Sequence, residues 1–218
     1  MRRLSRWHVW LGWLAGVPLL FWTASGLFMA SWPIEDVRGG QLRADARPLA
    51  LGGLVVPQAG SATRLTLVDE AGRPVWIAAA ADGALRRFDA RSGQPLPGVD
   101  EPEARAIALA SYRGAAPLTG MTRFAADNAP LDFRRERPSW QARFGDATHL
   151  YIDAETGEVL ALRTKLWRAY DFMWGLHIMD LQGRENAHRP VLIGFAGLAF
   201  VGSLMGCVLL FRRRRRKG

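Results

Sequence analysis

Two long apolar runs, one near each end of the chain, constrain the fold more than any other feature. Residues 7–32 contain no Asp, Glu, Lys or Arg, and residues 190–211 also lack them. Residues 9–30 and residues 190–211 are each 22 residues long. A helix of this length extends about 33 Å at ~1.5 Å per residue and crosses a ~30 Å hydrocarbon layer. We therefore predict two transmembrane helices, within residues 1–32 and 190–218.

The first run also begins like a signal peptide, because Arg2, Arg3 and Arg6 precede it. A secretory h-region is usually only ~7–15 apolar residues long and is followed by small residues at the cleavage site. This run is longer and ends in the bulky residues Phe28 and Met29. We interpret it as an uncleaved anchor.

Basic residues flank the two runs on their outer sides, before the first and at positions 212–217 after the second. The positive-inside rule then places both termini in the cytoplasm, which predicts a bacterial inner-membrane protein with residues 33–189 in the periplasm. The chain has 29 Lys and Arg against 20 Asp and Glu. Because the flanks hold the whole excess, we expect the bilayer and its anionic lipid heads as partners, and no nucleic acid. Cys207 lies in the second run, so the exported domain is predicted to lack disulfides.

Residues 33–165 have the pattern of a small α+β domain of antiparallel hairpin units. Alternating apolar positions, interrupted by Gly-containing turns, predict strands, and an acidic first turn followed by one apolar face predicts a packed helix at residues 101–112. The predicted strands are residues 64–69, 74–80, 84–90, 139–144, 149–153 and 159–163. Residues 35–57 are predicted to be irregular.

An internal repeat is the strongest signal within this domain. Residues 73–96 align without a gap to residues 137–160, with a constant offset of 64 and nine identities in 24 positions. Each copy contains an Asp and, four residues later, a Gly: Asp89 with Gly93, and Asp153 with Gly157. Asp caps a tight turn through its side chain and Gly permits positive φ. We interpret these four residues as structural rather than catalytic.

Several stretches resemble the family of PepSY domains and PepSY-associated transmembrane helices. The resemblance rests on YIDAETGEVL at residues 151–160, on Arg6-Trp7-His8 followed by LGWL and an apolar run to Ser-Gly, and on LHIMDLQG at residues 176–183 before the second span. Larger relatives with more spans resemble or include ferric-siderophore reductases that hold b-type haem through membrane histidines. Isolated PepSY modules are associated with inhibiting or chaperoning secreted proteases.

The resemblance implies two alternative functions. In the first, the chain is a non-catalytic component of an electron-transfer or iron-reduction system and holds haem b through His8 and His177. In the second, it is a haem-free module that binds or inhibits a periplasmic partner such as a protease. No sequence motif for a soluble active site is present, so we do not expect an enzyme.

His8 and His177 each have an ordinary alternative role. His8 belongs to a Trp-rich belt at the cytoplasmic mouth of the first span, and His177 lies on one face of a predicted amphipathic juxtamembrane helix within residues 166–189. His149 and His188 show no ligand spacing and are not expected to bind a metal. Because His8 and His177 lie at opposite faces of the bilayer, ~30 Å apart, they cannot hold one haem together.

The second axial ligand of each haem must then come from another residue, such as Met29 or Met179, from a membrane redox protein or from a homodimer partner. Two GxxxG pairs, Gly12 with Gly16 and Gly202 with Gly206, predict close helix packing, either between the two spans or between two chains. Pro18 is predicted to kink the first span.

Overall fold

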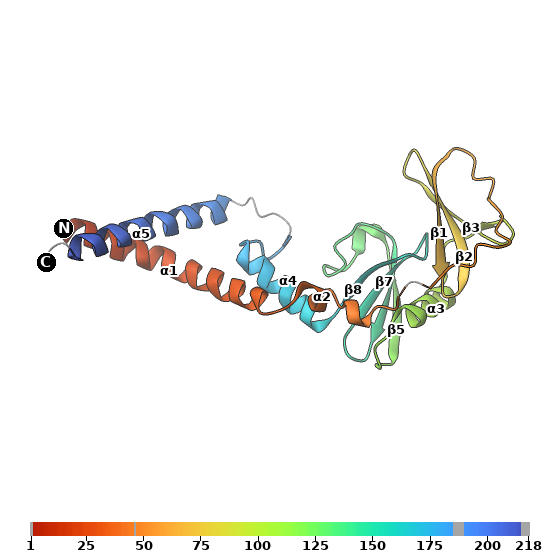
Figure 1. Cartoon of the computed structure of the whole chain (residues 1–218), viewed down its shortest axis with the longest axis horizontal. Coiled ribbons are helices and arrows are strands. Elements are labelled where there is room, and N and C mark those ends of the chain that lie inside the picture. Colours follow the sequence, from red (N-terminus) through yellow and green to blue (C-terminus); the bar gives the residue numbers. More distant parts are fainter. Residues whose placement is uncertain (1, 46, 185–189, 215–218) are drawn as a thin grey trace. The chain divides into compact units, whose positions relative to one another are not determined.

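The computed structural model describes the chain except for residues 1, 46, 185–189 and 215–218 (Figure 1). The prediction about His188 and the second half of the basic tail, residues 215–217, therefore lie outside the described residues. The chain divides into a helical unit, Met1–Pro33 with Arg168–Gly218, and a β-rich unit, Ile34–Trp167. Two antiparallel four-stranded sheets and an apolar helix near each terminus confirm the predicted α+β class.

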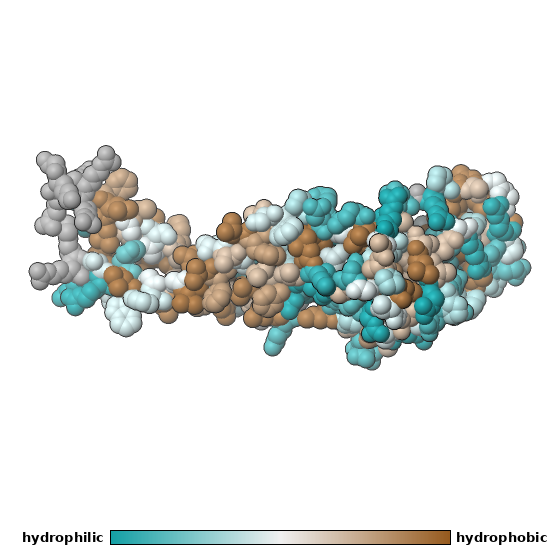
Figure 2. Space-filling model, turned by 90° about the horizontal axis from the view of Figure 1, so that it is seen from below, coloured by the Kyte–Doolittle hydropathy of each residue, from teal (hydrophilic) through white to brown (hydrophobic). Residues whose placement is uncertain are grey.

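The helical unit contains the two helices predicted to be spans, α1 (Arg2–Ala30) and α5 (Pro190–Arg214). Both are long and apolar enough to cross a membrane, and they pack against each other. Pro18 lies inside α1, which continues through it. Large apolar side chains such as Trp10, Trp13 and Phe211 are exposed, and Figure 2 shows many hydrophobic residues on this unit. Water disfavours so much exposed apolar surface, whereas a bilayer accommodates it.

The amphipathic helix before α5 is shorter than predicted. α4 spans Lys165–His177, and the described residues that follow it, 178–184, are not helical. The chain turns after His177, because Met179 adopts a φ of 56°, in the left-handed region that a continuing helix excludes. Arg184 Nη1 donates to Asp171 Oδ2 at 2.6 Å and fastens the turn to α4.

The β-rich unit contains two sheets with the same strand order, β1-β2-β3-β4 and β5-β6-β7-β8. The first comprises β1 (Ala62–Glu70), β2 (Arg73–Ala80), β3 (Leu85–Asp89) and β4 (Pro95–Leu96), and the second comprises β5 (Leu118–Phe124), β6 (Ser139–Phe144), β7 (His149–Asp153) and β8 (Val159–Arg163). α3 (Glu101–Ser111) connects the sheets. A short helix, α2 (Ile34–Val37), and a 3₁₀ turn, Gly40–Leu42, lie in the segment predicted to be irregular.

The predicted repeat corresponds to strands β2–β4 and β6–β8, and it extends to side-chain contacts. Trp76 Nε1 donates to Val55 O at 2.9 Å, and the equivalent Trp140 Nε1 donates to Val99 O at 2.9 Å. The repeats differ in the connection that precedes them. A two-residue turn joins β1 to β2, whereas residues 125–138, which we call the strap, join β5 to β6.

The core of the β-rich unit lies between α3 and the second sheet. Asp100 caps α3, since its Oδ1 accepts from Glu103 N at 2.9 Å. Small and apolar residues at helical spacing then face the sheet, and the buried cluster comprises Val99, Ala104, Ile107, Ala108, Ala142, Phe144, Leu150, Ile152 and Leu162. The segment before α3 is joined to the turn after β7, because Val99 N donates to Ala154 O at 2.8 Å.

Candidate functional site

A groove of about 450 Å³ lies between β1 of the first sheet and the start of β8 of the second sheet, within the β-rich unit. Four segments line it: the segment that holds residues 43–45, 47 and 49, the end of β1, the C-terminal half of α3, and the start of β8 with the turn before it. Its volume is in the range of ligand-binding pockets, which are mostly apolar with a few placed polar groups.

The groove combines an apolar floor with a charged rim. Apolar atoms dominate its lining, to which Leu67, Ile107 and Val159 contribute. Charged residues of both signs also line it, namely Arg43, Asp45, Arg47, Asp69, Glu70 and Glu158.

Arg43 covers part of an exposed strand edge at this groove. Its Nη2 donates to Val159 O, the first carbonyl of β8, at 3.2 Å. β8 is the last strand of its sheet, and edge strands present backbone groups that pair readily with other chains. The Arg43 side chain satisfies this carbonyl without closing the groove.

A buried ionic network lies behind the groove. The Arg87 side chain is 1% exposed and bonds to Glu70 at the end of β1 through Nε, at 3.2 Å, and through Nη2. Arg87 also donates to Glu103 of α3 at 2.7 and 3.1 Å, and to Pro97 O at 2.9 Å. One guanidinium therefore joins β1, β3 and α3.

Burial raises the pKa of the Glu70 carboxyl, and the Arg87 guanidinium opposes this rise. Glu70 also packs beneath the turn of the second repeat, where a Cβ built on Gly157 would lie 2.7 Å from Glu70 Oε1. Sequence reasoning did not identify this network. The sequence feature that could have indicated this network is the repeat. Arg87 aligns with Tyr151, and both are large residues that are fully buried.

The four turn residues have structural roles. Asp89 Oδ1 accepts from Arg91 N and Ser92 N, both at 2.9 Å, and Gly93 has a φ of 72°. The hydrogen bonds from Ser92 N and Arg91 N lower the pKa of the Asp89 carboxyl, and the bond from Ser92 N contributes most. Burial opposes this lowering.

The second turn has the same geometry. Asp153 Oδ1 accepts from Glu155 N at 2.8 Å and Thr156 N at 2.9 Å, and Gly157 has a φ of 73°. Each Asp is also paired with the Arg that opens its repeat, Arg73 with Asp89 at 3.2 Å and Arg137 with Asp153 at 2.6 Å.

His177 lies at the end of α4 and faces α1 within the helical unit. Its Nδ1 is 3.1 Å from Trp22 O and 3.1 Å from Ser25 Oγ, and Ser25 is fully buried. A protonated Nδ1 donates to the Trp22 carbonyl and leaves Nε2 as the acceptor nitrogen. A backbone carbonyl on one ring nitrogen is the usual way of orienting a metal-ligating histidine.

His8 is held differently. A Cβ built on Gly206 of α5 would lie 3.2 Å from His8 Cε1 and 3.6 Å from Nε2, so this ring edge packs against the α5 backbone. Nδ1 is buried and has no hydrogen-bond partner among the described residues. A porphyrin and α5 would compete for the Cε1–Nε2 edge, so His8 fits an axial-ligand role less well than His177.

The two histidines do not come together. Along α1, His8 and the Ser25 that contacts His177 are 17 residues apart, which is roughly 26 Å in a helix. The cavity between α1 and α5, lined in part by Trp22, Met179 and Phe195, has a volume of about 10 Å³. It accommodates one water at most, so a haem would have to lie outside this helix pair.

The predicted glycine contacts between the two spans occur at one position. Gly206 accommodates His8, whereas a Cβ built on Gly12, Gly16 or Gly202 would meet no atom within 4 Å in the described part of the chain. In the cavity between the two helices, α1 faces α5 through Ala15, Leu19 and Trp22. Self-association through the remaining glycines stays a prediction.

Comparison of the chain with protein-family models, curated proteins and solved structures finds no match. The resemblance to PepSY proteins therefore stays a prediction.

Replacing Arg87 by Leu should destabilise the β-rich unit by about 3–5 kcal/mol, because it leaves the buried Glu70 carboxylate unpaired. Chemical unfolding of the full-length protein in detergent measures this loss. The matched control is Arg105→Ala on α3, which breaks an exposed pair with Glu101 and should cost less than ~1 kcal/mol. Equal losses in the two variants would contradict a structural role of the network.

The Arg87→Leu penalty should also be smaller at pH 5 than at pH 8. A carboxyl whose pKa is higher in the folded than in the unfolded state binds more protons when folded, so stability increases as the pH falls through that pKa. Burial raises the pKa of Glu70 even with Arg87 in place. A penalty independent of pH would show that Glu70 is not the group left unpaired.

Proposed function

We propose that this protein is a membrane-anchored interaction module, with two spans in the bacterial inner membrane, both termini in the cytoplasm and residues 33–165 in the periplasm. The module binds a segment of a periplasmic protein in the groove between β1 and β8. The groove itself is the observation that carries this proposal, because it combines an apolar floor, a charged rim and strand edges from both sheets.

The lining of the groove favours an extended polypeptide as its occupant. β1 is the first strand of its sheet, and β8 is the last strand of the other, so each contributes an edge to the groove. An extended segment recognised at a strand edge gains main-chain hydrogen bonds, while apolar pockets select its side chains. The Ile107 and Val159 side chains provide such a surface, and Arg43 and Asp69 provide polar contacts at the rim.

Ala110→Trp tests this function, because an indole at this lining position fills the groove. A photo-crosslinking residue placed at Ser111, another lining residue, should capture a periplasmic protein in intact cells. Ala110→Trp should remove most of that adduct. Leu109→Trp is the matched control, because Leu109 is exposed on the same helix and does not line the groove. Equal adduct yields from both variants would contradict binding in the groove.

A second function, haem-dependent electron transfer in an iron-reduction system, is favoured by one observation. His177 Nδ1 is bonded to the Trp22 carbonyl, which prepares Nε2 to bind iron. When bound there, a haem b would supply one-electron chemistry; His177 at the end of α4 would hold it, and Ser25 of α1 would orient the His177 ring. The opposite axial ligand would come from a second copy of this chain or from another membrane redox protein.

Under adequate haem supply, this second function predicts a Soret band and a sharp reduced α-band for the detergent-purified protein. His177→Ala should remove the absorbance bands of the haem that the His177 imidazole would hold. His149→Ala, which removes a histidine from the β-rich unit, should leave the spectrum unchanged. Colourless wild-type protein would end the haem proposal and leave the interaction module.

A further inference from the structure

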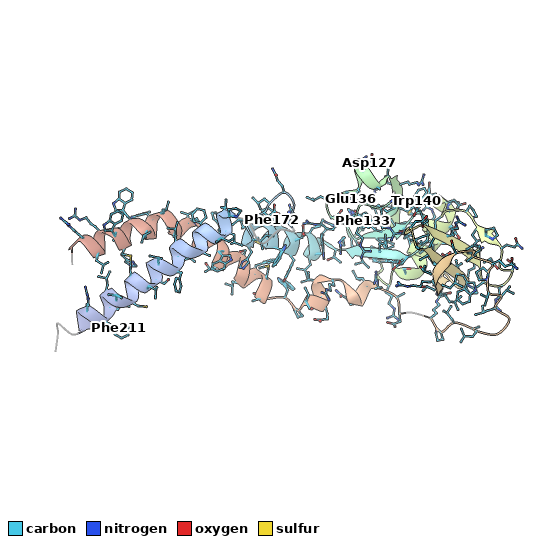
Figure 3. All side chains as sticks on the ribbon, turned by 90° about the horizontal axis from the view of Figure 1, so that it is seen from above. Asp127, Phe133, Glu136, Trp140, Phe172 and Phe211 are labelled. Carbon is cyan, nitrogen blue, oxygen red and sulfur yellow. The ribbon has the colours of Figure 1, made fainter. Side chains whose placement is uncertain are left out.

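The strap, residues 125–138, covers the face of the second sheet that points away from α3. Leu150 and Ile152 pack against α3, and Tyr151 between them points to the opposite face because strand side chains alternate. There Phe133 of the strap is fully buried and stacks on Tyr151, with ring centroids 4.7 Å apart. Figure 3 shows Phe133 near the sheet and Asp127 at the outer side of the strap.

Several donors from the sheet converge on Asp132, the residue before Phe133. The Tyr151 hydroxyl donates to Asp132 Oδ1 at 2.6 Å, and His149 Nδ1 lies 3.2 Å from Oδ2. Arg163 Nε donates to the Asp132 backbone carbonyl at 2.7 Å. Gln141 Nε2 donates to the Tyr151 hydroxyl at 2.6 Å, which directs the Tyr151 proton towards the carboxylate.

The environment keeps Tyr151 in its donating form. Burial, followed by the hydrogen bond to Asp132, raises the pKa of the Tyr151 hydroxyl above its usual range. A buried phenol that stays protonated is a strong donor to a carboxylate, because charge-assisted hydrogen bonds are shorter and stronger than neutral ones.

The first repeat shows that the fold does not require these donors. At the positions of Gln141 and His149 it has Ile77 and Leu85, and the connection equivalent to the strap is a two-residue turn. The polar donors and the long connection therefore occur together in the second repeat. Long, structured connections in compact domains are usually functional.

We propose that the second repeat contains a carboxylate-binding site formed by Tyr151, Gln141 and His149, that Asp132 fills this site and latches the strap closed, and that a carboxylate of a partner exchanges with Asp132 and opens the strap. Opening exposes the apolar surface of Tyr151 and Phe133. This site lies on the opposite face of the second sheet from α3 and does not depend on binding in the groove.

Tryptic cleavage at Arg134 and Arg135 reports strap opening in the full-length protein in detergent. Loss of the carboxylate in Asp132→Ala removes a charge-assisted hydrogen bond, so the cleavage rate should rise roughly tenfold or more. Asp127→Ala is the matched control, because Asp127 is exposed on the same strap, and it should leave the rate unchanged. Cleavage after Arg64, in β1 of the first sheet, provides an internal reference.

Sodium acetate, compared with sodium chloride at equal ionic strength, should act with opposite signs on two proteins. In Asp132→Ala, acetate fills the vacated site and slows cleavage of the strap. In the wild type, acetate competes with Asp132 and accelerates cleavage. Both effects should disappear in the variant Gln141→Ile with His149→Leu, which carries the residues of the first repeat.

Two results would overturn the proposal: acetate rates equal to chloride rates in both proteins, or an acetate effect of the same sign in both. If Asp132→Ala does not fold, Asp132→Asn replaces it, since the amide keeps the shape of the side chain but lacks its charge. Its strap should be cleaved at a rate between those of the wild type and a fully open strap. An Asp132→Asn rate equal to that of the wild type would also overturn the proposal.

Discussion

The chain is organised by the requirement that a segment crossing a bilayer be apolar over its whole length and satisfy its own backbone hydrogen bonds. α1 and α5 meet this requirement, and they lie at the two ends of the sequence. Everything between them must therefore lie on one side of the membrane if both helices cross it. The β-rich unit, Ile34–Trp167, belongs to the segment between the two helices.

Within the β-rich unit, the same strand order occurs in two sheets, and the two sheets carry different polar side-chain networks. The shared residues, such as Trp76 and Trp140, make equivalent bonds that maintain the sheet. The divergent residues give each copy its own polar centre. In the first repeat, the buried Arg87 joins the sheet to α3 and holds one wall of the groove. In the second, Tyr151 at the equivalent position bonds to Asp132 of the strap.

Sequence reasoning identified the elements that local patterns determine. The two apolar helices, α3 and most strands lie within a few residues of the predicted ranges, because apolar periodicity and turn residues specify them directly. β5 was not predicted, since Gly120 interrupts its pattern at an irregularity in the strand register. The end of α4 at His177 depends on the positive φ of Met179, and the residue types at these positions do not predict that conformation. The groove and the Asp132 site join segments far apart in the chain, so no local pattern reveals them.

The orientation of the β-rich unit relative to the membrane is the central claim, and cysteine labelling in intact cells tests it most directly. Cys207 is the single native cysteine, so Cys207→Ala provides a background without thiols. Asp127→Cys then places a thiol on the exposed side of the strap, and Gly218→Cys places one after the basic tail. A membrane-impermeant thiol reagent should label Asp127→Cys in intact cells and Gly218→Cys only after lysis. Labelling of Gly218→Cys and protection of Asp127→Cys in intact cells would contradict the account.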